Sequence, residues 1–383
     1  MSERDAHGGE VPLAALDGAN PLGFLASLGT LVTLEGAGET AARLRWRRGA
    51  TWLPVIDGVC ATEPDAFSAT VARGLRGRAI SADADARRDK TQKAYEAARS
   101  AAKKKFEEIK KRGLSRDERR KAIEAELRPL ETESERRREA WLKALADAVP
   151  RRELALGKRL DCAGDEYRQH ALAFRADADT RERDALDLLA AFGSDACLQP
   201  RGDAIEPTPF QFITGSGHQF FLETVRQLVD NVSEERVRRT LFEPWTYSDE
   251  SLSMRWDPID DRRYALMDRD PTASDNKSRT VWMANLLAYR ALALLPSAAR
   301  LGGLATSGWA IVDDELAFTW PIWEFPASID AVRSLVQLRD LTAARPDGAA
   351  LRARGVADVF RSRRVKVGTG ANFKLNFSPA RRV

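Results

Sequence analysis

Residues 16–35 contain the pattern that most constrains the fold of this chain, a capped helix that is apolar on nearly every side. Asn20 can accept hydrogen bonds from first-turn amides, and Pro21 suits the first helical position, where its missing N–H has no partner to lose. Apolar side chains then occur at all helical phases (Leu22, Phe24, Leu25, Leu28, Leu31, Val32 and Leu34). We therefore expect a buried helix. Gly23 and Gly29 each weaken a helix by up to about 1 kcal/mol, and we expect them to permit close approach of another backbone.

Short strands are predicted around this helix, at 11–16, 44–46 and 52–56, and helices dominate the middle third of the chain. The predicted fold class is α+β, with small mixed sheets, a buried N-terminal helix and an inserted long helical hairpin. We expect four segments: a β-α-β-β N-terminal unit (1–80), a basic helical hairpin (81–195), an α+β core domain (196–345) and a basic C-terminal segment (346–383). Later strands are expected at 210–214, 252–256, 307–312, 315–320, 364–367 and 373–377, and further helices at 219–229 and 276–295. A tight turn at Asp313 and Asp314 is expected to join the strands 307–312 and 315–320.

The net charge of +4 conceals two basic segments. Residues 87–143 contain 20 Lys and Arg against 12 Asp and Glu, and residues 352–383 contain 9 against the single Asp358. Each segment carries a net +8, so the remainder carries −12. Clusters of cations attract polyphosphates. The pattern is equally typical of a solvated hairpin with mixed charge, and that alternative stays open for the first segment.

The hairpin prediction rests on two stop-and-start signals. A helix over 88–112 has a narrow apolar stripe (Tyr95, Ala102, Phe106 and Ile109), and Gly113 ends it. Ser115 and Glu118 have the spacing of a capping box for the next helix. Pro129 breaks or kinks that helix, and a last one continues to Val149. The heptads do not persist, so we expect a long hairpin rather than a coiled coil.

Composition excludes several classes of protein. The chain has no apolar run of 18 residues, which is the length a membrane-spanning helix needs. Residues 1–10 are polar and lack the apolar stretch of a signal peptide. Cys60, Cys162 and Cys197 are scattered and odd in number, which fits a reducing compartment. We expect a cytoplasmic location and no contact with membranes.

Catalytic motifs are scarce, and we predict no enzyme, no cofactor and no metal site. Among the three histidines, only His218 lies in a turn that suits a binding role. Zinc-ligand spacings, a nucleotide-binding P-loop and a nucleophile elbow are all missing from the sequence. Asp257, Asp260 and Asp261 come nearest to a carboxylate cluster for Mg²⁺. Their simpler interpretation is a turn at Asp257 and pairing of Asp260 and Asp261 with the adjacent arginines.

Two local groups suit phosphate recognition. Residues 214–219 (Thr-Gly-Ser-Gly-His-Gln) join a predicted strand to a predicted helix, so Ser216, Gly217 and His218 could hold an anion at the helix start. The alternative is a tight connection with Ser216 as the N-cap. Residues 254–266 interleave aromatic residues with Arg262 and Arg263, which could clamp phosphates. The alternative is a core tryptophan with arginines paired to their aspartates.

The remaining candidates lie in the two basic segments. Along the predicted C-terminal strand, alternating cations suggest a contact surface (Arg361, Arg363, Arg364 and Lys366). In the hairpin, the most compact run of cations is Lys103, Lys104 and Lys105. Together these two segments predict a phosphate-tracking footprint.

Several blocks of the sequence resemble accessory proteins of type I-G CRISPR systems, formerly called I-U. The blocks are residues 16–29 (Leu-Asp-Gly-Ala-Asn-Pro-Leu-Gly-Phe-Leu-Ala-Ser-Leu-Gly), 43–46 (Arg-Leu-Arg-Trp), 52–58 (Trp-Leu-Pro-Val-Ile-Asp-Gly), 255–258 (Arg-Trp-Asp-Pro) and 261–266 (Asp-Arg-Arg-Tyr-Ala-Leu). Together they contain 35 of the 383 residues. The group includes a large-subunit-like component and an extension family of the helicase–nuclease. This chain lacks the helicase boxes and the His-Asp nuclease motif, and it is shorter than a typical large subunit.

The resemblance implies a non-catalytic part of an RNA-guided antiviral complex, or an adaptor to its nuclease. The expected partners are guide RNA or target DNA, and other effector subunits or the helicase–nuclease. Two other functions stay open. One is a metal-dependent nuclease that uses Asp257, Asp260 and Asp261, and the other is a protein–protein scaffold that meets no nucleic acid.

Overall fold

The computed structural model describes residues 9–176, 183–200, 202–213, 219–258, 279–367 and 374–383. Packing divides the chain into two units. Residues 1–77 and 158–383 form the larger one, here called the body, and residues 78–157 form the second, here called the arm. The arm is shorter than the helical segment we expected at 81–195. The difference arises because α6 (Gly164–Ala176) and α7 (Arg183–Phe192) pack within the body, where α7 contacts the 3₁₀ turn Leu292–Leu294.

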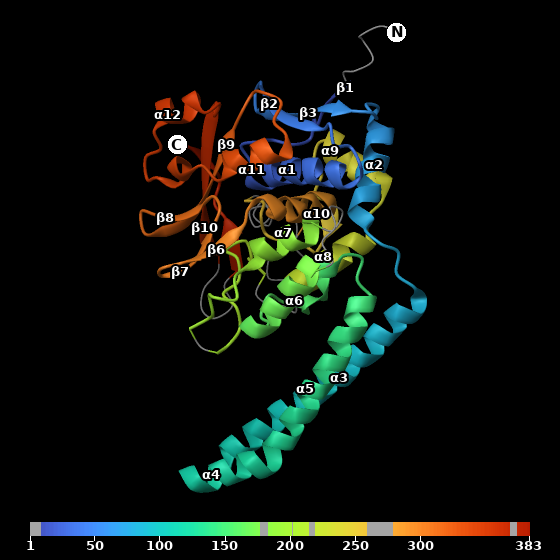
Figure 1. Ribbon diagram of the computed structural model, residues 1–383, viewed down its shortest axis with the longest axis vertical. Helices are drawn as coiled ribbons and strands as arrows, with labels where there is room; N and C mark the ends of the chain where they lie inside the picture. The colour runs from blue at the N-terminus through green and yellow to red at the C-terminus, as the bar shows by residue number, and fades with distance from the viewer. Residues whose placement is uncertain (1–8, 177–182, 201, 214–218, 259–278, 368–373) are drawn as a thin grey trace, which may run out of the picture. The chain divides into compact units, whose positions relative to one another are not determined.

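The central element of the body is α1 (Pro21–Gly36), the helix that the cap at Asn20 predicts. The Asn20 side chain accepts hydrogen bonds from the amides of Leu22 at 2.8 Å and Gly23 at 3.1 Å. The helix is buried from Pro21 to Leu34, as its uniform apolarity predicts. It lies between a three-stranded sheet and α10 (Trp282–Ala291) (Figure 1).

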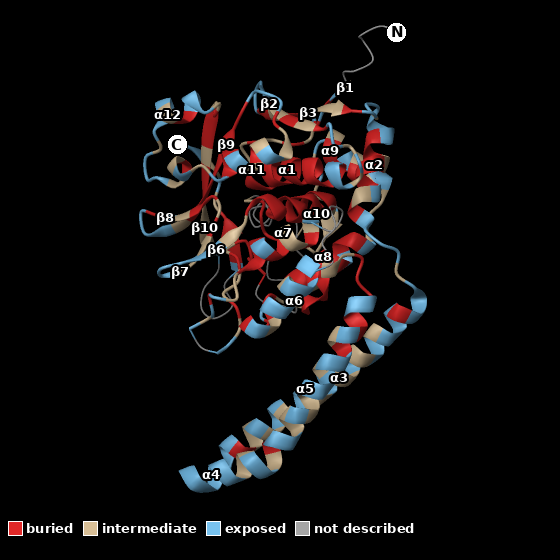
Figure 2. Cartoon of the chain, in the orientation of Figure 1, coloured by how far each residue is buried: buried red, intermediate tan, exposed pale blue. Residues whose placement is uncertain are grey.

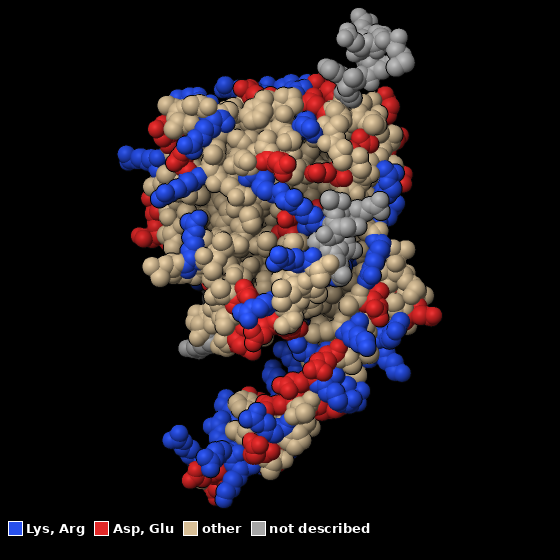
Figure 3. All heavy atoms as spheres, viewed as in Figure 1, with Lys and Arg blue, Asp and Glu red and all other residues tan. Residues whose placement is uncertain are grey.

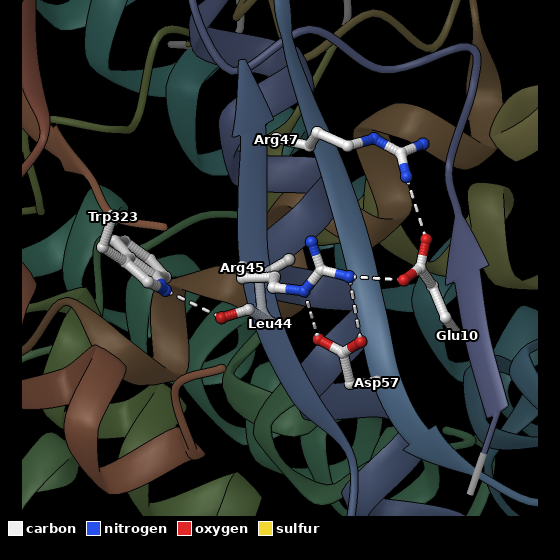
Figure 4. Close-up of polar contacts among 6 residues, drawn as sticks. All are labelled: Glu10, Leu44, Arg45, Arg47, Asp57 and Trp323. Atoms are coloured by element: carbon white, nitrogen blue, oxygen red, sulfur yellow. Dashed lines mark hydrogen bonds and ion pairs between the residues drawn. The ribbon is translucent and has the colours of Figure 1, made fainter. Parts of the chain in front are cut away.

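The sheet beside α1 is antiparallel, with the order β1-β3-β2. Its strands are β1 (Gly9–Pro12), β2 (Arg43–Arg48) and β3 (Trp52–Val59). Arg45 and Glu10 hold the three strands together, because Arg45 donates to Asp57 on β3 at 2.9 Å and to Glu10 on β1 at 2.5 Å (Figure 4). The Trp323 indole donates to the carbonyl of Leu44 at 2.7 Å and joins β2 to the end of the second sheet.

The second sheet has the order β11-β10-β9-β8, and β12 also pairs with β10. Its strands are β8 (Trp309–Val312), β9 (Glu315–Ile322), β10 (Asp358–Val367), β11 (Lys374–Phe377) and β12 (Arg381–Arg382). Asp313 and Asp314 form the predicted tight turn between β8 and β9, and both adopt positive φ. The remaining body elements are α2 (Pro64–Arg76), α8 (Phe221–Asp230), α9 (Glu234–Phe242), β4 (Asp249–Glu250), β5 (Arg279–Thr280), β6 (Ser297–Arg300), β7 (Gly303–Thr306), α11 (Ile329–Val336) and α12 (Gly348–Ala353). The predicted α+β class is therefore confirmed.

Aromatic residues join the two sheets through α1. The Phe24 ring stacks on Trp46 of β2 and contacts Trp320 of β9, in each case with ring centroids 5.7 Å apart. Gly29 allows α10 to approach, since a Cβ there would lie 1.7 Å from the Leu287 carbonyl oxygen. Such a contact is impossible for any other residue type without movement of the backbone. The expectation of close packing at this glycine is confirmed.

Two predicted strands are wrong. Residues 252–256 form no strand because Leu252 and Arg255 adopt positive φ, and the Met254 amide donates to the side chain of Asn285 at 2.9 Å. The described part of the other, 210–213, is irregular, and its aromatic side chains enter the core. Phe210 packs against Trp309 with ring centroids 5.1 Å apart. In both segments the apolar residues occupy the core, but the backbone hydrogen bonds do not form a ladder.

Candidate nucleic-acid interface

The arm is built from two long antiparallel helices and a short one between them. They are α3 (Ala82–Lys111), α4 (Arg116–Ala122) and α5 (Arg128–Asp147), with a π-helical turn over Ile123–Leu127. The predicted capping box is confirmed, since Ser115 and Glu118 exchange side chain-to-backbone hydrogen bonds at the start of α4. Pro129 lies in the first turn of α5, immediately after the π-helical turn.

A narrow seam holds α3 against α5. Tyr95 stacks on Trp141 with ring centroids 5.4 Å apart, and Ile109 and Leu127 are buried nearer the α4 end. Phe106, which we expected in this stripe, is 39% exposed. Outside this seam most of the arm is exposed or of intermediate burial (Figure 2). Most charged residues of the arm are therefore exposed to solvent.

Basic charge is concentrated in the half of the arm that contains α4. Residues 103–121 contain ten Lys and Arg against four Asp and Glu, a net of +6. Figure 3 shows basic side chains gathered at this end on the face in view. Residues 122–143 contain five against six, a net of −1. The +8 found from the sequence is therefore not spread evenly along the hairpin.

Ion pairs separate the cations of the arm into two groups. Arg112 makes a bidentate contact with Glu126 at 2.5 and 2.8 Å, which fastens α3 to the π-helical turn. Lys105 pairs with Glu108 at 3.0 Å, and the hydrogen bond to Glu108 raises the pKa of the Lys105 ammonium group. Lys105, one of our predicted contacts, is thus already engaged within the arm.

The second group makes no ion pair and no side-chain hydrogen bond within the described part of the chain. At the α4 end it comprises Lys103, Lys104, Lys111, Arg116, Arg119, Arg120 and Lys121, which we call the basic tip. All seven are exposed. Only Lys103 and Lys104 of these seven are among the contacts predicted from the sequence. A residue-by-residue charge count over 103–121 would have revealed the others.

The basic C-terminal strand differs from our expectation. It forms β10, an interior strand between β9 and β11. Arg361 is only 8% exposed, and its guanidinium donates to Thr319 Oγ1 at 2.9 Å and to the Ala343 carbonyl at 2.6 Å. Burial lowers its pKa. A guanidinium held in this way cannot also contact a phosphate. Arg361 is therefore a structural residue and not part of the predicted nucleic-acid interface.

Its neighbours on β10 are also engaged. Arg363 forms ion pairs with Asp313 and Glu315 at the β8–β9 turn. Arg364 lies over the Phe212 ring, 5.4 Å from its centroid, and burial lowers the pKa of its guanidinium. Lys366 also interacts within the protein. The strand is a packed element of the sheet rather than a free contact surface.

Several predicted site residues lie outside the described residues: Ser216, Gly217, His218, Arg262, Arg263, Asp260 and Asp261. Asp257 is described and is fully buried. Its carboxylate accepts hydrogen bonds from Tyr247 at 2.8 Å and Asn20 at 3.2 Å. Among the described residues, no group of three or more His, Cys, Asp or Glu could hold a metal ion.

Comparison with known proteins identifies no relative. No family model matches the chain, nor does any curated protein or any solved structure. Within the part of the chain that the structure describes, no helix is both long enough and apolar enough to span a membrane.

Proposed function

We propose that this protein is a non-catalytic nucleic-acid-binding subunit that contacts phosphates through the basic tip of its arm. The observation that supports this is the separation of charges within the arm. Glu126, Glu108 and Glu133 neutralise neighbouring cations, whereas the basic tip stays unpaired. Exposed cations on a long, thin arm can approach a polyanion with little loss of hydration, and counterion release then favours binding.

The broader setting that we propose is an RNA-guided antiviral complex similar to type I-G CRISPR effectors. This part of the proposal rests on the resemblance of the sequence blocks. The first of these blocks meets two others inside the body: a Cβ on Gly18 would lie 2.7 Å from the Trp46 ring, and Asn20 bonds to Asp257. In the four blocks that the structure describes (16–29, 43–46, 52–58 and 255–258) most residues are buried, which favours a role in supporting the body over a role as a contact site.

Binding to labelled single-stranded RNA, single-stranded DNA and duplex DNA tests the proposal, measured by fluorescence anisotropy from about 50 to 300 mM salt. The test variant replaces Arg116, Arg119 and Arg120 with Gln. The control replaces Arg128, Arg136 and Arg137 with Gln, which removes the same charge from cations that are already paired.

We expect the wild-type affinity to fall steeply with salt. The test variant should lower the log–log slope by about 2 to 3, since each phosphate contact contributes about 0.7 to 0.9. The control should lower it by less than half as much. Equal effects of the two variants would contradict the role of the basic tip. Failure to bind any of the three probes at the lowest salt would favour the protein scaffold.

The antiviral setting has its own readout. RNA that copurifies with the tagged protein from its native host should contain CRISPR repeat sequence. Copurified nucleic acid of random sequence would be consistent with phosphate binding but would contradict a role in an RNA-guided complex. A nuclease that uses the Asp cluster is less favoured, because Asp257 is committed to Asn20 and Tyr247 in the interior.

A further inference from the structure

The strand β8 forms one edge of the second sheet. The amide of Thr319 donates to the Gly308 carbonyl at 2.8 Å, and Trp309 lies opposite Phe318. Hydrogen bonding alternates along an antiparallel pair, so Ala310 and Val312 bond to β9. The main-chain N–H and C=O groups of Trp309 and Ile311 therefore point toward the open edge.

This edge lacks the features that usually prevent pairing with another chain. Its sequence is Trp-Ala-Ile-Val, without the Lys or Pro residues that typically protect exposed edges. The Ile311 side chain is 74% exposed. The β6–β7 hairpin lies beside it (Figure 1). Leu301, in the turn of this hairpin, is fully exposed. An apolar edge of this kind favours addition of a strand.

Opposite charges lie at the two ends of β8. Asp314 follows its C-terminal end and has no ion pair among the described residues, whereas Asp313 is neutralised by Arg363. A cavity of about 290 Å³ lies at the N-terminal end, lined by Gly308, Trp309, Arg300 and Arg339 among others. Neither arginine has an ion pair in the described chain. The edge is thus basic at one end, apolar in the middle and acidic at the other.

We propose that β8 pairs with β8 of a second copy of this chain in an antiparallel, two-fold symmetric dimer. A self-complementary patch is what a two-fold interface requires. In the register that centres on Ile311, Asp314 lies opposite Gly308 of the second copy. Gly308 lines the same cavity as Arg300 and Arg339, so each acidic end meets a basic end. The outward main-chain groups of the two Ile311 residues then hydrogen-bond to each other.

The oligomeric state of the full-length protein tests this proposal, by sedimentation equilibrium over about 1 to 100 μM protein. We expect a reversible dimer. Ile311→Lys should weaken it at least tenfold, because it places two cations at the symmetry axis. Leu172→Lys is the matched control, since Leu172 is another exposed apolar side chain, 52% exposed on α6, and it should leave the dimer unchanged. Asp314→Asn tolerates the same positive φ, and it should weaken the dimer several-fold and reduce its salt dependence.

Cross-linking tests the register independently. With exposed Cys60 replaced by Ser, Ile311→Cys should give a disulfide-linked dimer on mild oxidation by copper phenanthroline, and Leu172→Cys should not. Circular dichroism shows whether each variant is folded. A monomer throughout the concentration range would overturn the proposal, and so would a dimer that tolerates Ile311→Lys. Because the test contains no nucleic acid and all its substitutions lie outside the arm, its outcome is independent of the proposed function.

Discussion

Asn20 and Asp257 are 237 residues apart in the chain, and their side chains form a 3.2 Å hydrogen bond in the interior. The side-chain oxygen of Asn20 caps α1, and its side-chain nitrogen donates the hydrogen bond to Asp257. One side chain thus fixes both the start of the central helix and the position of a buried carboxylate. Tyr247, which adopts positive φ, donates to the other carboxylate oxygen.

Replacement of Asn20 should separate these two roles. Asn20→Ser keeps a capping oxygen and removes one donor to Asp257, so we expect a loss of about 1 to 2 kcal/mol in the free energy of unfolding. Asn20→Asp also keeps the cap but places a second carboxylate beside Asp257, and should cost about 2 to 4 kcal/mol. Urea unfolding at pH 7 measures both. A less severe effect for Asn20→Asp than for Asn20→Ser would contradict this account.

Gly29 should be intolerant of any side chain. Gly29→Ala forces α1 and α10 apart, because the added Cβ would collide with the Leu287 carbonyl. We expect a loss of about 3 kcal/mol or more. Gly36→Ala is the matched control in the same helix, where the nearest atom is 3.4 Å away, and alanine should be neutral or stabilise by up to about 1 kcal/mol. Thermal unfolding of the two variants should show opposite or clearly separated shifts.

Arg361 should affect stability and leave nucleic-acid binding unchanged. Arg361→Gln leaves the carbonyls of Leu341, Ala343 and Ala344 without their charged donor, and we expect a loss of about 2 to 4 kcal/mol. Arg363→Gln, at a surface ion pair, should cost less than about 1 kcal/mol. Measurements below the unfolding transition should find the wild-type salt slope for Arg361→Gln. A reduced salt slope of binding in the folded variant would instead indicate that Arg361 contacts nucleic acid.

Glu133 offers a pH test within the arm. Its carboxylate accepts hydrogen bonds from Arg136 and Arg137. These bonds, with that from Arg136 the larger contribution, lower the pKa of Glu133 to about 2. The unfolded value is near 4.5, so the stabilisation is present above that pH and is lost as the pH falls through about 2. A ¹³C NMR titration of the side-chain carboxyl should show this low midpoint. The Arg136→Gln, Arg137→Gln double variant should raise it, and so should high salt, because the group is exposed.

Features set by neighbouring residues could be predicted from the sequence. The Asn20 cap, the Ser115–Glu118 capping box and the Asp313–Asp314 turn each depend on contacts within a few residues. The failed strand at 252–256 depends instead on Asn285, which takes the Met254 amide from far along the chain. The local pattern of apolar residues cannot predict this hydrogen bond with a distant residue.

The candidate site divides in the same way. Lys103 and Lys104 were found because adjacent cations are conspicuous, and exposure on a thin hairpin follows from its narrow stripe. The alternating arginines of 361–364 gave a misleading signal, since alternation reports which face a side chain occupies and not where its strand lies in the sheet. Sheet order placed that strand in the interior, and local spacing does not determine sheet order.

The arm begins and ends at one place. The Arg78 amide donates to the Pro150 carbonyl at 3.0 Å, and its guanidinium donates to the Val149 carbonyl at 2.7 Å. The first residue of the arm is thus hydrogen-bonded to the segment that follows α5, near the arm's other end. Residues 78–157 therefore have the character of an exchangeable cassette. The arm could therefore be lengthened, replaced or deleted, and its charged surface changed, without redesign of the hydrophobic core of the body.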